Sequence, residues 1–148
     1  MPKRELPTAK DDGSRIFVDT SGWIALFSAR DQNLWEADRA FRTLIGSKRR
    51  LLTTNLVIAE VHRLLLHRVG IQAAATALAK IESSPAVQIA FPGPDHHGMG
   101  KGWLVRLGGH AISYTDAVSF AVMEVSACGQ AVSYDKHFRL AGFDLFEV

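Results

Sequence analysis

The length, composition and charge of this chain exclude several classes of protein at the outset. Its 148 residues, 47% of them hydrophobic, are close to the usual size of one globular domain and can bury a core without disulfide bonds. The lone cysteine, Cys128, cannot form an internal disulfide, so a reducing cytoplasm is the expected location. A net charge of +2 permits contact with a polyanion but does not by itself indicate one.

The first fourteen residues, MPKRELPTAKDDGS, differ in composition from the rest of the chain. They are charged and rich in proline and small residues, and they contain no apolar stretch that could act as a signal peptide or a membrane span. We therefore expect a flexible leader over residues 1–14, followed by one domain over residues 15–148.

From Arg15 onward, short apolar runs alternate with longer segments of helical periodicity. This alternation is typical of an α/β domain built on a mostly parallel sheet. Strands are expected over Arg15–Asp19, Leu51–Thr53, Val87–Phe91, Ala131–Tyr134 and Phe143–Phe146. Helices are expected over Gly22–Ser28, Asn33–Ile45, Asn55–Arg68 and Ile71–Ile81, near Trp103 after a mobile glycine-rich segment, and from Thr115 to just before Gly129. Asn55 and Thr115 are the expected caps of their helices.

Two aspartates lie at the carboxyl ends of expected strands. Asp19 closes the run RIFVD, and Asp135 follows AVSY. In open parallel sheets, sites form outside the carboxyl ends of the strands, at the point where the strand order reverses. If these two strands are neighbours at that reversal, Asp19 and Asp135 face each other across a crevice.

Asp116 and Glu60 each have two interpretations. Asp116 opens the helix that leads to the fourth strand, so it either joins the same edge of the sheet or forms a capping box with Ser113. Glu60 lies in the apolar run NLVIAEVHRLLL, where it either needs a partner or a bound ion, or reaches water at the edge of the helix. Spacing alone favours capping for Asp116 and leaves Glu60 open.

A cluster of these four carboxylates would be tolerable only with bound cations, because like charges repel. Oxygen ligands without a thiolate or an obligatory histidine favour Mg²⁺ or Mn²⁺. Two such ions can activate an attacking water and stabilise the departing oxygen of a phosphodiester. Zinc finds less support, because His96 and His97 lack further ligands at suitable spacing and the motif HExxH is absent.

Four segments of the chain together resemble the signature blocks of the PIN-domain nucleases: FVDTSGW, NLVIAEV, YTDAVSFAVM and VSYDKHFRLAGF. The resemblance extends from about Arg15 to Val148 and implies a three-layer α/β/α, Rossmann-like fold with a short, mostly parallel sheet. The leader departs from the family, whose first strand usually begins almost at the N-terminus. The compact size and the closing blocks are most similar to the VapC-type toxins of toxin–antitoxin pairs. Those toxins are cytoplasmic, usually dimeric endoribonucleases that use Mg²⁺ or Mn²⁺, and each is silenced by a small antitoxin.

The resemblance implies roles for particular residues. Asp19, Glu60, Asp116 and Asp135 would be the catalytic acids that hold the metal, and Ser133 would hydrogen-bond Asp135 or a metal-bound water. Thr20 and Ser21 could orient the first acid or serve as turn residues. The implied reaction is hydrolysis of single-stranded or looped RNA by in-line attack of a metal-activated water. Basic residues outside the cleft are the candidates for phosphate binding, namely Lys48, Arg49, Arg50, Lys136, His137 and Arg139. Phe138 is expected to anchor the last loop in the core.

Two other classes of small α/β protein with clustered acids find no support in the residues around Asp19. A phospho-acceptor receiver domain needs an adjacent acidic pair after its first strand, and Asp19 has no acidic neighbour. Dehalogenase-type phosphatases need a second aspartate two positions after the first, where this chain has Ser21. A PIN-domain nuclease that matures ribosomal RNA, and a non-catalytic signalling or binding module, both stay open. A neighbouring gene for a DNA-binding antitoxin would favour the toxin.

Overall fold

The computed structural model describes residues 12–147, and within them five parallel strands form one sheet. Of the leader expected over residues 1–14, residues 1–11 lie outside the described part, as does Val148. The strands are β1 (Arg15–Val18), β2 (Arg50–Thr54), β3 (Val87–Ala90), β4 (Gln130–Val132) and β5 (Asp144–Leu145). Their order across the sheet is β3-β2-β1-β4-β5, and every neighbouring pair is parallel.

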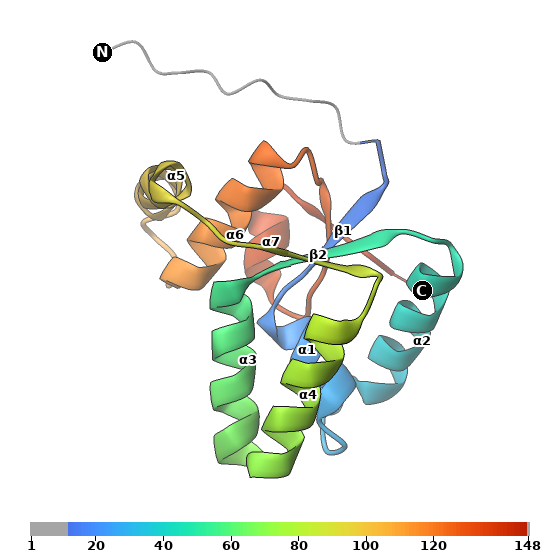
Figure 1. The fold of residues 1–148 in the computed structure, drawn as a ribbon. Coiled ribbons are helices and arrows are strands. Elements are labelled where there is room, and N and C mark those ends of the chain that lie inside the picture. The colour runs from blue at the N-terminus through green and yellow to red at the C-terminus, as the bar shows by residue number, and fades with distance from the viewer. Residues whose placement is uncertain (1–11, 148) are drawn as a thin grey trace.

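Helices cover both faces of this sheet (Figure 1). They are α1 (Thr20–Phe27), α2 (Leu34–Gly46), α3 (Asn55–Arg68), α4 (Ile71–Ser83), α5 (Pro94–Arg106), α6 (Tyr114–Val125) and α7 (Lys136–Leu140). Helices α1 to α4 lie on one face, whereas α6 and α7 lie on the other with α5 packed on α6. This arrangement confirms the expected three-layer α/β/α fold. Right-handed crossovers lead from β1 to β2 and β3 on one side and then back to β4 and β5 on the other side of β1, which places the two sets of helices on opposite faces. No helix of residues 12–147 has the length and apolar character needed to cross a membrane.

The strand order reverses between β1 and β4, which meets the condition under which Asp19 and Asp135 were expected to face each other. The chain leaves β1 for β2 and β3, and it then returns to the opposite side of β1 to form β4 and β5. Phe17 and Val18 of β1 pair in register with Ala131 and Val132 of β4. The residues that follow β1 and β4 are therefore neighbours at the carboxyl edge of the sheet.

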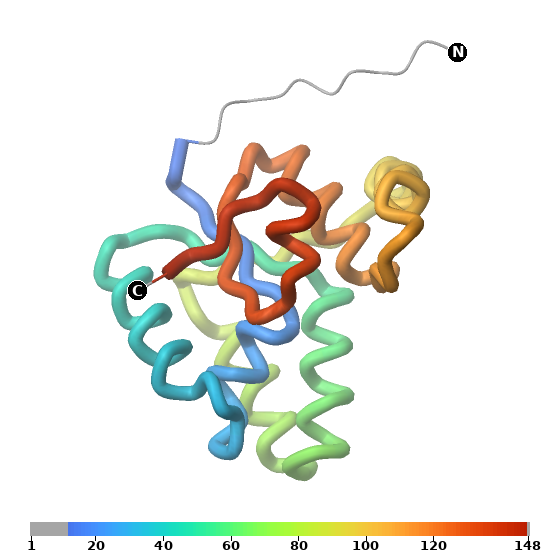
Figure 2. Tube along the Cα trace, turned by 180° about the vertical axis from the view of Figure 1, so that it is seen from behind, coloured from blue at the N-terminus to red at the C-terminus, as the bar shows by residue number. Residues whose placement is uncertain are grey.

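Aromatic packing holds the C-terminal segment against this part of the sheet. Phe138 of α7 is fully buried; its ring stacks on Phe17 of β1 at 6.0 Å and meets the edge of Phe120 of α6 at 5.0 Å. The expectation that Phe138 anchors the core is confirmed. Seen from behind, the segment after the last strand ends beside α2 (Figure 2).

The glycine-rich segment before Trp103 is helical, which corrects the expectation of a mobile stretch there. Helix α5 begins at Pro94, a favourable first helical residue, and the Gly93 amide donates to Nδ1 of His96 at 3.1 Å. Gly100 also packs closely on α6, where an added Cβ would lie 3.2 Å from a methyl group of Val118. The glycines that weaken the helical signal in the sequence thus allow this helix pair to form.

Two helices are capped one or two residues earlier than expected. Thr54 rather than Asn55 caps α3, because the Thr54 hydroxyl accepts a hydrogen bond from the Val57 amide at 3.1 Å. Ser113 rather than Thr115 caps α6, with its hydroxyl accepting from the Asp116 amide at 3.1 Å. In both places neighbouring residues are also good caps, so the local sequence does not distinguish them.

Candidate active site

Asp19 is held by three hydrogen bonds at the point where β1 passes into α1. Its Oδ1 accepts from the Ser21 hydroxyl at 2.8 Å and from the Gly22 amide at 2.9 Å, and its Oδ2 accepts from the Ser133 hydroxyl at 2.7 Å. Only 3% of Asp19 is exposed. Burial raises the pKa of Asp19 to about 7, although the three hydrogen bonds act to lower it. A cation bound close to this carboxylate would favour its charged form.

Gly22 allows the first turn of α1 to approach β4. A Cβ at this position would lie 2.7 Å from the backbone oxygen of Val132, too close for any side chain. The glycine of the segment TSGW thus has a packing role, and it also supplies one of the amides that bind Asp19.

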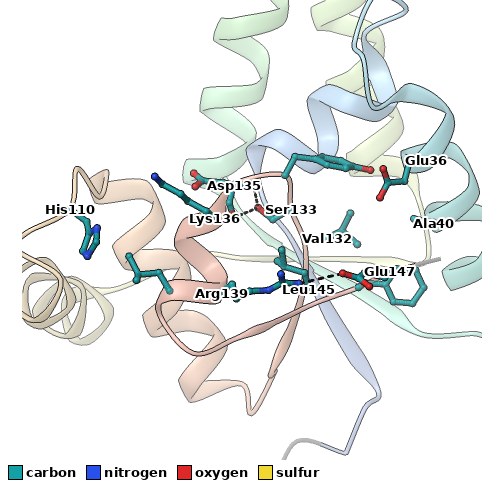
Figure 3. A pocket seen from close by; sticks show the side chains of 13 residues that line it. Glu36, Ala40, His110, Val132, Ser133, Asp135, Lys136, Arg139, Leu145 and Glu147 are labelled. Carbon is teal, nitrogen blue, oxygen red and sulfur yellow. Dashed lines mark hydrogen bonds and ion pairs between the residues drawn. The ribbon is translucent and has the colours of Figure 1, made fainter.

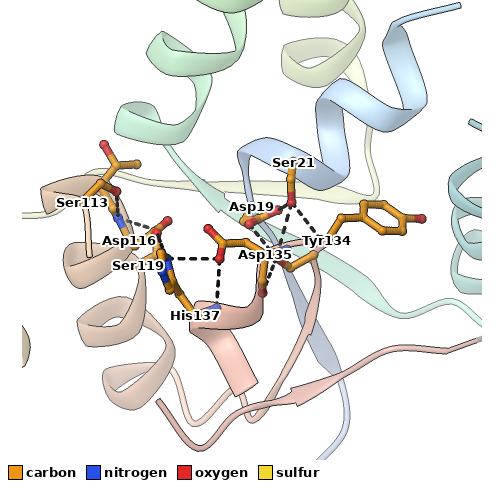
Figure 4. A network of polar contacts seen from close by, with 10 residues as sticks. Asp19, Ser21, Ser113, Asp116, Ser119, Tyr134, Asp135 and His137 are labelled. Atoms are coloured by element: carbon orange, nitrogen blue, oxygen red, sulfur yellow. Dashed lines mark hydrogen bonds and ion pairs between the residues drawn. The ribbon is translucent and has the colours of Figure 1, made fainter. Parts of the chain in front are cut away.

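The turn after β4 is joined to the turn after β1 by two serine hydroxyls (Figure 4). The Ser133 hydroxyl accepts from the Asp135 amide at 2.9 Å while donating to Asp19, and the Ser21 hydroxyl accepts from the Tyr134 amide at 2.9 Å. Ser133 was expected to bond Asp135 or a metal-bound water; the structure places it between Asp135 and Asp19. Ser21 has the orienting contact that the sequence allowed for it.

Asp116 directs its carboxylate toward the other acids rather than toward the cap of its own helix. Oδ2 of Asp116 lies 3.3 Å from Nδ1 of His137, and the same nitrogen lies 3.1 Å from Oδ1 of Asp135. Burial, and then the negative charge of Asp135, raise the pKa of Asp116 to about 6. The capping interpretation, which spacing alone favoured, therefore applies to Ser113 and not to the Asp116 side chain.

His137 makes contacts that the sequence did not predict with two of the acids. It was expected only as a phosphate-binding candidate, yet its ring joins Asp116 and Asp135, and one ligand atom from each of these three residues lies within 4.8 Å of the others. The available signal was its spacing. Asp135 caps α7 by accepting from the His137 amide at 2.9 Å, which brings the residue two positions after the acid back to its carboxylate.

Glu60 completes a pocket that all four predicted acids line. This acid pocket, lined by Asp19, Glu60, Asp116 and Asp135 among others, has a volume of about 380 Å³. Glu60 is half-buried on α3, and its negative charge contributes to the raised pKa of Asp116. Its position favours the interpretation that Glu60 belongs to a charged site over that of a carboxylate at a plain helix edge.

The electrostatics of the acid pocket fit a divalent cation. Asp31 adds a fifth carboxylate to its wall, and among the described lining residues Arg68 is the only permanently charged cation. Carboxylate oxygens with a single imidazole form a hard donor set, which suits Mg²⁺ or Mn²⁺ better than a thiolate-seeking metal. The residues present therefore fit the metal that the sequence implied.

The basic run Lys48, Arg49 and Arg50 lies at the opposite edge of the sheet. Arg50 pairs in register with Arg15 at the start of β1, and the Arg49 guanidinium donates to the Gln130 side chain at 2.9 Å and to the Arg15 carbonyl at 3.2 Å. Arg49 thus ties together the amino ends of three strands. This placement gives no support to RNA contact by the run, in contrast to Lys136 and Arg139 on the acid side.

The strand order reverses between two strands that are each followed by an acid, and flanking helices supply two further acids, an arrangement that fits a PIN-domain nuclease. The PIN domain family model matches residues 16–144, and the chain belongs to this family. It is 39% identical over 129 residues to the 23S rRNA-specific endonuclease VapC20 of Mycobacterium tuberculosis (strain CDC 1551 / Oshkosh), covering 86% of this chain and 95% of the relative. The same protein of strain ATCC 25618 / H37Rv matches equally.

Solved structures agree with this assignment. The crystal structure of Mycobacterium tuberculosis VapC20, described as a Sarcin-Ricin loop cleaving toxin, superposes with a TM-score of 0.81 at 37% identity, covering 90% of this chain and 99% of that one. VapBC2 from Rickettsia felis, bound to a DNA fragment from their promoter, gives 0.68 at 12% identity, with 89% and 97% of the two chains covered. FitAcB from Neisseria gonorrhoeae gives 0.64 at 14%, with 89% and 96% covered. The last two show the fold alone, whereas the VapC20 matches confirm the predicted class, a PIN-domain ribonuclease of the VapC toxin type.

Proposed function

We propose that Asp19, Glu60, Asp116 and Asp135 hold one or two divalent cations, Mg²⁺ or Mn²⁺, with which the protein hydrolyses a phosphodiester bond of RNA. The observation that carries this proposal is the acid pocket, in which side chains from four separate parts of the chain converge. The raised pKa values of Asp19 and Asp116 support it, because a cation is what stabilises the charged form of carboxylates that are buried and lie near other negative charges.

The residues of the site have distinct tasks in this reaction. A bound divalent cation would supply activation of a water and stabilisation of the leaving oxygen. Ser21 and Ser133 hold both oxygens of Asp19 in place. His137 keeps Asp116 and Asp135 together despite their repulsion. Because no side chain is required as a nucleophile, cleavage needs no covalent intermediate and is expected to leave a 5′-phosphate and a 3′-hydroxyl.

We further propose a stem-loop of large-subunit ribosomal RNA as the substrate. The support is the identity of 39% to a 23S rRNA-specific endonuclease over most of both chains. Looped RNA also suits a site at the open edge of a sheet, because unpaired nucleotides can be splayed out for recognition. Maturation of ribosomal RNA as a housekeeping reaction is the second candidate, and it differs in leaving functional rather than inactivated ribosomes.

The partners proposed for the chain are a small antitoxin and a second copy of itself, and the proposed location is the cytoplasm. Resemblance to the VapC toxins supports the antitoxin and the homodimer. Co-purification of the chain with the product of an adjacent short reading frame, and loss of RNA cleavage in that complex, would test the first. Light scattering of the purified chain would test the second.

The central experiment is cleavage of a sarcin-ricin stem-loop RNA and of a scrambled hairpin by the purified protein in Mg²⁺, Mn²⁺ or chelator. Asp19→Asn and Asp116→Asn are expected to abolish cutting while circular dichroism shows the fold retained. Glu124→Gln is the matched control, because Glu124 is an exposed acid on the same helix as Asp116. Cutting that survives chelator and both aspartate substitutions would refute the proposal.

A further inference from the structure

A second and larger cavity, drawn in Figure 3, adjoins the acid pocket through shared lining residues. This second pocket has a volume of about 640 Å³, within the range of small-molecule sites, and it shares Tyr134 and Asp135 with the acid pocket. Figure 3 shows it running from His110 across α7 and β5 to Glu36 on α2. None of the tasks assigned above uses it.

The floor of the second pocket is apolar. It is formed by Ala40 of α2, Val132 of β4, Leu140 at the end of α7, and Leu145 and Phe146 at the last strand. These side chains come from four elements that meet only in the folded chain. An apolar, aromatic-lined floor suits the face of a flat ring, since every nucleobase has an apolar face that can stack.

The rim of the second pocket carries charge that suits a nucleotide. Lys136 directly follows Asp135, Arg139 lies one turn later on α7, and His110 stands at the far end. Arg139 contacts Glu147 at 3.3 Å, but both side chains are mostly exposed, so this ion pair is weak and can yield to a phosphate. Glu36 and Glu147 add acceptors for the amino groups on the edge of a base.

We infer that the second pocket is a nucleotide subsite that receives one unpaired base of the RNA next to the bond being cut, with Lys136 and Arg139 on its phosphate. This inference rests on the proposed function. The reason for placing the base here is the wall of Tyr134 and Asp135 that the two pockets share. An RNA chain with its scissile phosphate at the acids would have the neighbouring nucleotide at this wall. The subsite would therefore contribute to the choice of cleavage position.

The first test fills the pocket with a larger side chain. Leu140 is 42% exposed at the end of α7, so Leu140→Trp is expected to place an indole in the pocket without replacing a core residue. Val105→Trp is the control, because Val105 is 82% exposed on α5 and lines neither pocket. We expect Leu140→Trp to lower kcat/KM on the stem-loop RNA about tenfold or more, mainly through KM, and Val105→Trp to match the wild type. Equal kcat/KM in the two variants would overturn the inference.

The second test removes the base instead of the pocket. A series of stem-loop RNAs, each abasic at one nucleotide near the cut, is cleaved by the wild type and by Leu140→Trp. At one abasic position we expect the cleavage rate of the wild type to fall about tenfold. At the same position we expect no further fall in the cleavage rate of Leu140→Trp. The same loss in both proteins at every position would contradict the subsite. Lys136→Gln removes a positive charge without adding a large side chain. It is expected to weaken RNA binding and to reduce the salt dependence of that binding.

A binding measurement separates this inference from the proposed reaction. Affinity for a fluorescent stem-loop RNA is measured in the Asp116→Asn background with and without Leu140→Trp. If the wild type cuts no RNA but Leu140→Trp still weakens binding tenfold, the subsite stands and the hydrolysis proposal fails. If Leu140→Trp binds and cuts RNA normally but escapes silencing when co-expressed with the adjacent antitoxin, the pocket receives protein and the inference is wrong.

Discussion

The Ser133 hydroxyl donates a 2.7 Å hydrogen bond to Oδ2 of Asp19, across 114 residues of sequence. The same hydroxyl accepts from the Asp135 amide, so one atom fixes the first acid and the backbone of the last. Loss of a group that orients a metal ligand in this way typically lowers metal affinity by about 10- to 100-fold.

Ser133→Ala is therefore expected to lower Mn²⁺ affinity about tenfold or more and to destabilise the protein by about 1 kcal/mol. The loss of a hydrogen bond to a buried carboxylate is the physical reason. Calorimetric titration with Mn²⁺ and thermal unfolding would measure both effects. Ser133→Thr keeps the hydroxyl and is the control; an affinity unchanged in Ser133→Ala would show that the bond does not position Asp19.

Replacement of His137 by alanine is expected to destabilise the metal-free protein more than the metal-bound protein. Without the imidazole, Asp116 and Asp135 repel each other with no group between them, whereas a bound cation would take over that task. Unfolding in chelator and in saturating Mn²⁺ would measure the difference. His67→Ala, at an exposed position near the end of α3, is the control. A loss of stability that is the same with and without metal would mean that His137 acts by packing alone.

The metal-free protein is expected to lose stability as the pH rises from 5 to 8. The pKa of Asp19 is raised to about 7 and that of Asp116 to about 6, both above the ordinary value of 3.8 that applies to the unfolded chain. Between these values the folded state binds more protons than the unfolded state, so the free energy of unfolding falls with increasing pH. The slope for Asp19 is steepest near pH 5 to 6, at about 1.3 kcal/mol per pH unit, and falls to about 0.7 kcal/mol per pH unit at pH 7.

Urea denaturation in chelator across this pH range would measure that slope. Asp19→Asn carries no titrating group at this position and is expected to flatten the curve, and saturating Mg²⁺ is expected to flatten it in the wild type. Stability that rises toward pH 8 in the metal-free wild type would contradict the raised pKa values.

Arg68→Ala is expected to raise KM for RNA several-fold while leaving kcat nearly unchanged. Arg68 lies two helical turns after Glu60 on α3 and lines the acid pocket, where its charge can bind a substrate phosphate. The slope of log affinity against log salt should fall by about one. Arg63→Ala on the same helix is the control, since Arg63 is exposed and lines neither pocket. An unchanged salt slope in Arg68→Ala would exclude a phosphate contact.

Gly22→Ala is expected to destabilise the protein by about 1–3 kcal/mol, because the new Cβ would meet the Val132 oxygen at 2.7 Å and push α1 away from β4. The same movement would withdraw an amide from Asp19 and weaken Mn²⁺ binding. Gly46→Ala is the control: a Cβ there meets nothing within 4 Å, so the substitution should be neutral or stabilising. Equal stability of the two variants would show that the contact with β4 is not needed.

The sequence by itself determined most of the secondary structure and the four acids. Local apolar periodicity predicts strands such as β1 and helices such as α3. Asp19 and Asp135 are recognisable as candidates because they directly follow predicted strands. The resemblance of four short segments then indicated Glu60, which spacing alone left open, and Asp116, for which spacing alone favoured capping.

The tertiary structure decided how these residues meet. His137 joins Asp116 to Asp135, Ser21 and Ser133 connect two turns more than a hundred residues apart, and the second pocket has walls from α2, β4, α7 and β5. These contacts depend on which elements become neighbours in space. Local sequence periodicity does not determine which elements pack together. Helix α5 is a further example. Its glycines predict an interruption of the helix in the sequence, whereas in the structure Gly100 allows α5 to pack closely on α6.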